Sequence, residues 1–251
     1  TYVAYIETKL PQCMKEKWVE IRILVPKLGL INERKNRLHE VVRLSGMNIP
    51  IGDDDKPLII KVASIPTAKL QVYFIDNEDY FKRKTVFNNK AGKFHKDNDE
   101  RCLFFCKGVL ETVIKLGWSP DIIHCNDWMS SLIPLLIKTS YSDRHIFENT
   151  KCIFSIYENG FKEKLDKKMI DKIIDEDIDK DMLSSLKSND YSGLIKIASE
   201  YSDAIIRPDK DLNKSLEESI SSISPKNKVH KIPENEKSVE SHYKLYNEIL
   251  N

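Results

Sequence analysis

The stretch Asp121–Ser131, DIIHCNDWMSS, decides which class of fold this chain adopts. It begins as a short apolar strand that ends at His124 and Cys125, and it then turns through Asn126 and Asp127 into a helix. In open α/β proteins, a strand that delivers polar side chains to a helix start is the usual place for a ligand. These polar side chains either take part in chemistry or only cap the helix.

Capping is the simpler of the two interpretations. Asp127 is a good N-cap, because the free amides and the dipole at a helix start favour a carboxylate. Trp128 would then pack against the sheet, and His124 would be a buried, hydrogen-bonded side chain. Spacing alone favours this structural role over a catalytic one.

Composition indicates a globular α/β protein and excludes several functional classes. The 251 residues are 41% hydrophobic and 31% charged, which suits one large α/β domain or two small ones. The 40 Lys and Arg nearly balance the 39 Asp and Glu, so no overall field would recruit nucleic acid or an anionic membrane. Five Cys without a CxxC pair predict free thiols in a reducing compartment. Because no signal-peptide pattern and no membrane-length apolar run occurs, a cytoplasmic location is expected.

The first third of the chain predicts a strand, a helix and a strand, followed by a strand pair. Strands are expected over Tyr2–Ile6 and Val19–Val25, with a helix over Lys9–Trp18 between them. The runs Leu58–Val62 and Leu70–Ile75 predict two further strands. The alternating side chains of residues 38–44 suggest that this segment joins them, so an antiparallel excursion from about Leu38 to Ile75 is expected.

From Asn98 onward, alternating strands and helices predict a mainly parallel sheet. Asn98–Leu116 is the longest helix candidate, with a broad apolar face and Gly117 placed to end it. No repeat or flexible linker divides the chain, so a single three-layer α/β domain over residues 1–251 is expected. The remaining predicted strands are Asp121–His124, Lys151–Ile156, Asp203–Pro208 and Lys228–Ile232. The remaining predicted helices are Asp127–Lys138, Lys162–Ile174, Tyr191–Tyr201, Leu212–Ile223 and Glu236–Leu250.

Four other clusters could carry chemistry, and each has a simpler structural explanation. Asp97–Arg101, DNDER, is either a helix cap with an acidic first turn or an Asp-Asn pair for sugar hydroxyls. Cys102 and Cys106 share a helix face without further metal ligands at useful spacing, so two buried hydrophobic side chains are expected. DEDIDKD at Asp175–Asp181 lacks the glycine and terminal glutamate of a calcium loop. KRKTV at Lys82–Val86 is too small a basic patch for nucleic acid, and no metal site is expected.

Several stretches together resemble the bacterial glycogen and starch synthases. LGWSPDIIHCNDWMSSLIPLL (Leu116–Leu136) resembles the family's LGWxPDIVHCHDWHTALxP. DNDERCLFFCKGVLE (Asp97–Glu111) resembles its DNxxRFxxFxxAxLE helix, and YFIDNEDYFKR (Tyr73–Arg83) resembles its segment around VYFIDNxxYFxR. IFSIYENGF (Ile153–Phe161) and SEYSDAIIRPDKDL (Ser199–Leu212) fall where the family has TIHNxxYQG and ADxVxTVSPxYA.

These stretches are collinear with the family and cover most of the chain, which makes them far more specific together than singly. INERKNRLHEVVRLSGMN (Ile31–Asn48) is shared with the short, single-domain glycogen and starch synthase-like proteins of Bacteroidetes-type bacteria.

The resemblance implies a GT-B glycosyltransferase with two Rossmann-like domains. The first domain binds the growing glucan and supplies a glycine-rich lysine loop, and the second binds most of ADP-glucose. The reaction transfers glucose from ADP-glucose to the non-reducing end of an α-1,4-glucan with retention at C1. It requires no metal or other cofactor, because positioning and stabilisation of the leaving diphosphate supply most of the catalysis.

The sequence departs from the family pattern in three ways. It ends near Asn251, where the family's first domain ends, so no C-terminal nucleotide-sugar domain is expected. The KxGGLGD loop between the first strand and helix is missing, since ETK runs directly into LPQCM and no glycine precedes Gly29. Asn126, Met129 and Tyr157 stand where the family has histidines that could bind substrate or move protons.

We therefore expect a starch synthase catalytic-type domain that is inactive or incomplete as an isolated chain, or alternatively a non-catalytic glucan-binding or regulatory module. The expected partners are an α-glucan or maltooligosaccharide, ADP-glucose, and either a second copy or a chain that supplies the other domain. No catalytic residue is assigned. The candidate substrate-binding residues, expected to cluster at the carboxyl edge of the sheet, are Asp97, Asn98, Arg101, Asn126, Asp127, Tyr157 and Glu158.

Overall fold

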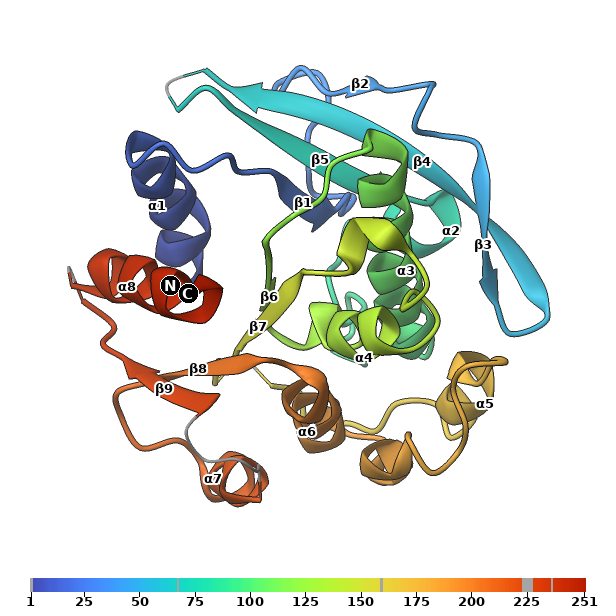
Figure 1. Ribbon diagram of the computed structural model, residues 1–251. Coiled ribbons are helices and arrows are strands. Elements are labelled where there is room, and N and C mark those ends of the chain that lie inside the picture. Colours follow the sequence, from blue (N-terminus) through green and yellow to red (C-terminus); the bar gives the residue numbers. More distant parts are fainter. Residues whose placement is uncertain (1, 67, 159, 223–227, 236) are drawn as a thin grey trace. The chain divides into compact units, whose positions relative to one another are not determined.

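The computed structural model describes residues 2–66, 68–158, 160–222, 228–235 and 237–251. The chain divides into two compact units, Thr1–Leu116 and Gly117–Asn251, and each is described by itself. The described strands form a mixed sheet in the first unit and a parallel sheet in the second (Figure 1). The expectation of a single domain depends on how the units join, and it stays a prediction.

The chain opens with helix α1, Tyr2–Glu16, so the strand predicted over Tyr2–Ile6 is wrong. Apolar residues recur every four positions from Tyr2 to Met14, and this spacing suits one continuous helix face. A five-residue apolar run is too short to distinguish a strand from a helix, and the helical pattern that follows it extends back through it. The first strand of this unit is therefore β1, Ile23–Pro26, which overlaps only the last three residues of the strand predicted over Val19–Val25.

The mixed sheet is centred on the long strand β4, Asp54–Ile65. β4 pairs antiparallel with β5 (Leu70–Asp76), which in turn pairs in parallel with β1. β2 (His39–Glu40) and β3 (Met47–Ile51) both pair antiparallel with β4. The predicted antiparallel excursion is confirmed, although the strand expected over residues 38–44 is only two residues long.

Two helices complete the first unit. The short helix α2, Glu78–Phe81, is capped by Asn77, whose side chain accepts the Tyr80 N–H at 3.2 Å. The long helix α3, Asn98–Leu116, has the predicted bounds and ends where Gly117 takes φ +62°, a conformation that favours glycine. Cys102 and Cys106 of α3 are fully buried, which confirms their structural interpretation.

The second unit is built on a sheet of four parallel strands in chain order. On one face, Ile153, Ala204 and Ile206 form a core with Leu245 of helix α8 (Ser238–Leu250). Phe154 and Ile205, the alternate residues, are also fully buried, as expected when helices cover both faces. This α/β layering, with α8 and α6 (Tyr191–Tyr201) beside the sheet in Figure 1, confirms the predicted fold class. The strands are β6 (Ile122–Asn126), β7 (Lys151–Ser155), β8 (Ala204–Pro208) and β9 (Val229–Ile232).

Two predicted helices of this unit are shorter in the structure. The helix expected over Asp127–Lys138 is a 3-10 turn, Trp128–Ser130, followed by α4, Ile133–Lys138, with Pro134 in its first turn. Proline favours the first turn of a helix because it lacks an N–H, so a new helix begins there. Within Lys162–Ile174 only α5, Met169–Ile173, is helical. The other helices are α6 (Tyr191–Tyr201), α7 (Lys214–Ser221) and α8 (Ser238–Leu250), while Ile223 and Glu236, at the ends of two predicted helices, lie outside the described residues.

Within the part of the chain that the structure describes, no helix has the length and apolar character needed to cross a bilayer.

Candidate functional site

The carboxyl ends of β6 and β7 bring two predicted site residues into direct contact. Asn126 ends β6, and Tyr157 lies two residues beyond the end of β7. The Tyr157 hydroxyl donates a hydrogen bond to Asn126 Oδ1 at 2.8 Å. Glu158, the next residue, accepts the N–H of Asn213 at 2.9 Å, just before α7 begins. Three of the predicted residues therefore lie along the edge where parallel α/β sheets usually bind ligands.

Asp127 adopts a backbone conformation that is rare for any residue except glycine, with φ 60° and ψ 177°. Its N–H donates to the Ser155 carbonyl at 3.2 Å, and its Oδ1 accepts the Trp128 N–H at 2.8 Å. Oδ1 also accepts the Tyr191 hydroxyl at 3.2 Å. These contacts hold the strained backbone in place, and strain of this kind is concentrated at functional sites.

Asp127 is half-buried, and the partial burial changes the acidity of its carboxyl group. Burial raises the pKa of Asp127 to about 6, although the hydrogen bonds from Trp128 and Tyr191 act in the opposite direction. Burial and the nearby Asp127 raise the pKa of Tyr191, so its hydroxyl remains a donor. Asp127 therefore exchanges its proton close to neutral pH, where it can donate or accept a hydrogen bond to a sugar hydroxyl.

Replacing Asp127 with Asn is expected to stabilise the protein at neutral pH. Between about pH 4 and 6 the folded chain retains the Asp127 proton while the unfolded chain has released it, so the wild-type free energy of unfolding falls as pH rises through this window. The loss is up to about 3 kcal/mol. The substituted asparagine has no proton to lose and remains a good cap, so urea unfolding should show equal stability at pH 4 and a more stable variant at pH 7.

Asp209→Asn removes the same charge from an exposed position and is the matched control. If Asp127→Asn and wild type lose stability in parallel between pH 4 and 7, the carboxyl of Asp127 does not titrate as described.

Behind this edge, a partly buried hydrogen-bond network joins the sheet to helix α8. His124 contacts the Ser155 hydroxyl through Nε2 at 2.7 Å and the Tyr246 hydroxyl through Nδ1 at 2.6 Å. Burial and the nearby His242 lower the pKa of His124 to about 3, so the ring is neutral and serves as one donor and one acceptor. The carbonyl of Ser155 accepts the Asp127 N–H, so this hydrogen-bond network also helps to hold Asp127 in position. His124 is thus the hydrogen-bonded histidine that the sequence predicts, although the residue is half-buried and not fully buried.

The same edge contains two residues that were not predicted from the sequence. Tyr191, at the start of α6, donates its hydroxyl to the Tyr157 carbonyl as well as to Asp127. Arg207, near the end of β8, is buried and binds both carboxylate oxygens of Glu217 at 2.7 and 2.8 Å. Arg207 could have been predicted, because it is a charged residue at the end of the apolar run AIIRP. Nothing in the local sequence indicates that Tyr191 belongs to the site.

The other three predicted residues lie in the first unit, around the start of α3. Asp97 forms an ion pair with Arg83. Asn98 is fully buried and donates to the Phe87 carbonyl at 3.0 Å. Arg101, also buried, donates to the Val86 carbonyl and to Asn98 Oδ1, both at 2.6 Å. These side chains hold the preceding loop, residues 82–96, so their recorded bonds support the cap-like interpretation of the DNDER run.

The charges of this group are closely coupled. Burial acts to raise the pKa of Asp97, but the hydrogen bonds and charge of Arg83 outweigh it and hold the pKa below its usual value. Burial and the neighbouring Arg83 lower the pKa of Arg101 to about 10, so it stays charged at neutral pH. Whether this group meets the carboxyl-edge residues of the second unit stays a prediction.

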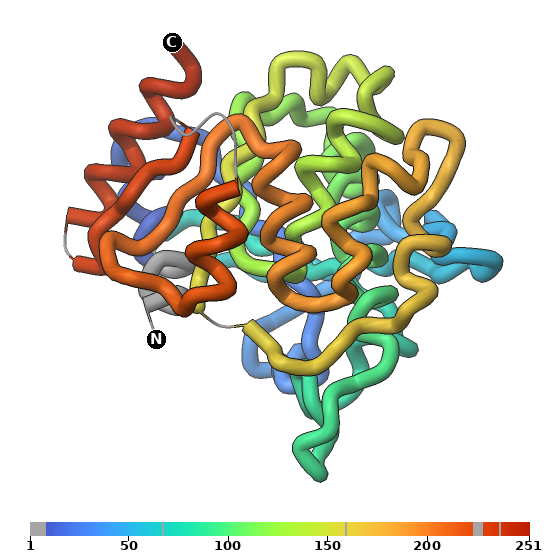
Figure 2. Tube along the Cα trace, turned by 90° about the horizontal axis from the view of Figure 1, so that it is seen from below, coloured from blue at the N-terminus to red at the C-terminus, as the bar shows by residue number. Residues whose placement is uncertain are grey.

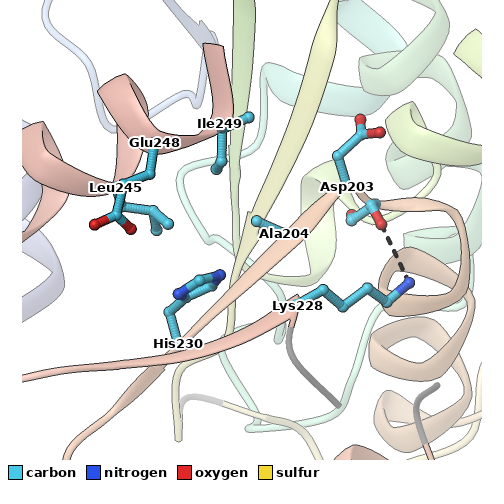
Figure 3. Close-up of a pocket in the computed structure, with 8 residues that line it drawn as sticks. Asp203, Ala204, Lys228, His230, Leu245, Glu248 and Ile249 are labelled. Atoms are coloured by element: carbon cyan, nitrogen blue, oxygen red, sulfur yellow. Dashed lines mark hydrogen bonds between the residues drawn. The ribbon is translucent and has the colours of Figure 1, made fainter. Parts of the chain in front are cut away.

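A separate cavity lies at the opposite, amino edge of the parallel sheet (Figure 3). Its Lys228 donates to the carbonyls of Glu200 and Ser202 at 3.3 and 3.2 Å, which satisfies the C-terminal end of α6. Asp203 accepts the Cys152 N–H at 2.7 Å. Because these groups serve the fold, the carboxyl edge is the better candidate site. The lining residues are Ser202, Asp203, Ala204, Lys228, His230, Leu245, Glu248 and Ile249.

No group of three or more His, Cys, Asp or Glu side chains among the described residues is arranged to hold a metal ion.

Comparison with known proteins yields one family. Residues 3–217 match the family model described as the starch synthase catalytic domain. The glycogen synthase of Chlorobium luteolum is 47% identical over 154 residues, which are 61% of this chain and 31% of the relative. The glycogen synthase of Chlorobaculum parvum is 44% identical over 163 residues, 63% of this chain and 33% of the relative. The chain therefore spans about a third of the length of the curated relatives it matches.

One solved structure shows the same fold at low sequence identity. The catalytic domain of starch synthase IV from Arabidopsis thaliana, bound to ADP and acarbose, aligns with a TM-score of 0.71 and 16% identity. The alignment covers 91% of this chain and 47% of the plant chain.

Proposed function

The chain belongs to the starch synthase catalytic domain family, and from this premise we propose that its carboxyl-edge site binds an α-1,4-glucan. In the family reaction this glucan accepts glucose from ADP-glucose. In our proposal the 251 residues supply glucan binding but do not transfer glucose by themselves. A cytoplasmic location and a partner that provides the nucleotide-sugar half, either another chain or another part of the same protein, belong to this proposal.

The contact between Tyr157 and Asn126 is the observation that carries the proposal. It joins segments 31 residues apart at the edge of the sheet where ligands usually bind. Beside it, Asp127 Oδ1 already accepts two hydrogen bonds, while Oδ2 accepts none from the described residues. An amide, a phenol and a carboxyl group with a pKa near neutrality together supply both donors and acceptors for sugar hydroxyls.

A second candidate is a non-catalytic glucan-binding or regulatory module, favoured by one observation. Asn126, Met129 and Tyr157 occupy the three positions where the family pattern has histidines. Met129 is buried and has no side-chain group for proton transfer. Glucan binding is common to both candidates, and glucosyl transfer by a complex that includes this chain distinguishes them.

Replacing Tyr157 with Phe is expected to weaken maltoheptaose binding about 3- to 10-fold, the effect of losing one hydrogen bond that orders the site. Isothermal titration calorimetry measures the affinity. Tyr201→Phe removes a hydroxyl from the end of α6 and is the matched control. Unchanged affinity in both Tyr157→Phe and Asn126→Ala would show that glucan does not bind at this edge.

A further inference from the structure

The loop between α2 and α3 concentrates positive charge. Residues 82–96, KRKTVFNNKAGKFHK, contain six Lys or Arg and no Asp or Glu. The remainder of the chain therefore has 34 Lys and Arg against 39 Asp and Glu, an excess of negative charge. We refer to residues 82–96 as the basic finger, and its tip extends away from the rest of the first unit in Figure 2.

Hydrogen bonds give the basic finger a defined shape. Asn88 and Phe94 form an antiparallel bridge, and the His95 N–H donates to the Phe87 carbonyl at 2.8 Å. At the tip, the Asn89 side chain accepts the N–H groups of Ala91 and Lys93 at 2.9 and 3.0 Å. The tip of the finger is therefore a tight turn that one antiparallel bridge and the Asn89 side chain hold closed.

The base of the basic finger is anchored by residues outside the finger. Arg83 pairs with Asp97, while Arg101 and Asn98 bind the carbonyls of Val86 and Phe87. Arg101 and Asn98 are buried, so the anchor is part of the core of the first unit. This anchoring fixes the position of the finger's charges before a ligand arrives, which lowers the entropic cost of binding.

Four lysines of the basic finger are available to a partner. Lys82 is paired with Glu78 at 2.9 Å, and Arg83 is paired with Asp97. Burial and the charges of Arg83 and Arg101 lower the pKa of His95, so this side chain adds no charge at neutral pH. The four that remain are exposed and form no ion pair within the described residues: Lys84, Lys90, Lys93 and Lys96.

We propose that the basic finger binds phosphate groups carried on an α-glucan, so that the chain prefers phosphorylated glucan over neutral glucan. The glucan part rests on the proposed function, and the phosphate part rests on the finger. Lysine ammonium groups bind phosphate as point charges. A neutral sugar chain carries no negative charge that could pair with four lysines. Nucleic acid fits less well, because the remainder of the chain has an excess of negative charge that would repel a long polyanion.

The test compares one glycogen preparation, chemically phosphorylated, before and after phosphatase treatment. Surface-immobilised protein should bind the phosphorylated form on the order of 10-fold more tightly at low salt, since four exposed ion pairs each contribute modestly. The preference should shrink as salt is raised. Replacing the four free lysines with Gln should abolish it. Lys35, Lys151, Lys167 and Lys187, which are exposed and lie outside the finger, provide a control variant with the same loss of charge that should retain it.

Equal binding of the two glycogen forms, or loss of the preference in the control variant as well, would overturn the inference. A further ligand to test is oligouridylate at the same phosphate concentration. If it binds more tightly than phosphorylated glycogen, and only when the finger lysines are present, the partner is nucleic acid and the inference is overturned. Tyr157→Phe should weaken binding of both glycogen forms equally and leave their ratio unchanged. If neutral glycogen does not bind while the phosphate preference remains, the carboxyl-edge proposal fails and the finger inference stands.

Discussion

Incubated with radiolabelled ADP-glucose and glycogen, the purified 251-residue chain is expected to transfer no detectable glucose. Stabilising a departing diphosphate needs donors fixed around it, and the loss of one such donor costs on the order of 100-fold or more in rate. The 251 residues contain no glycine before Gly29 and no pair of adjacent glycines, so the tested chain does not carry the family's glycine-rich lysine loop. The chain also spans about a third of its glycogen synthase relatives. These deficits do not add simply, but each lowers the rate.

A complete glycogen synthase serves as the positive control for this assay. Incorporation by the chain alone that is abolished by Tyr157→Phe would contradict the prediction, because it would show a working transferase whose site lies at the carboxyl edge. Incorporation that appears only after a nucleotide-sugar-binding half is added would agree with the prediction. That result would also favour the enzymatic proposal over the regulatory one.

Replacing Trp128 with Ala is expected to lower the free energy of unfolding by about 3–5 kcal/mol. Its side chain is 1% exposed and packs edge-on against Phe161 with ring centroids 5.1 Å apart. Truncation removes a large apolar surface from the core and leaves a cavity. A loss of this size approaches the whole stability of a typical domain, so urea unfolding followed by circular dichroism should show a far earlier transition.

Trp18→Ala supplies the matched control, because Trp18 is 97% exposed. The same chemical change at this position should alter stability by less than about 0.5 kcal/mol. If the two variants unfold at similar urea concentrations, Trp128 does not anchor the second unit.

Local patterns predicted most of the second unit. α6 has the predicted bounds, and each of the four parallel strands overlaps its predicted range, because apolar runs bounded by Pro, Asn or Asp are informative over five to ten residues. The errors arose where two local patterns conflict. Tyr2–Ile6 satisfies both strand and helix spacing, and Asp127–Lys138 contains Pro134, which begins a new helix inside an otherwise helical pattern.

The candidate site was only partly predictable, because its contacts cross large distances in sequence. Asn126, Asp127 and Tyr157 follow predicted strands, and this position alone points to a ligand site. Position after a strand did not identify Tyr191, which reaches Asp127 across 64 residues, or the link between His124 and Tyr246 across 122 residues. Such pairs depend on the order of the strands in the sheet and on where α6 and α8 pack. A short stretch of sequence contains no information on either.

The sequence by itself determined the family resemblance, the α/β class and the strand-end positions of the polar residues, because these follow from residue order and short-range periodicity. Tertiary structure alone decided what the polar side chains do. It committed Asn98 and Arg101 to the backbone of the basic finger and placed Asp127 where burial raises its pKa to about 6. The physical reason is that burial and hydrogen bonding depend on which segments meet in space, and desolvation acts on a carboxyl group only after the chain has folded around it.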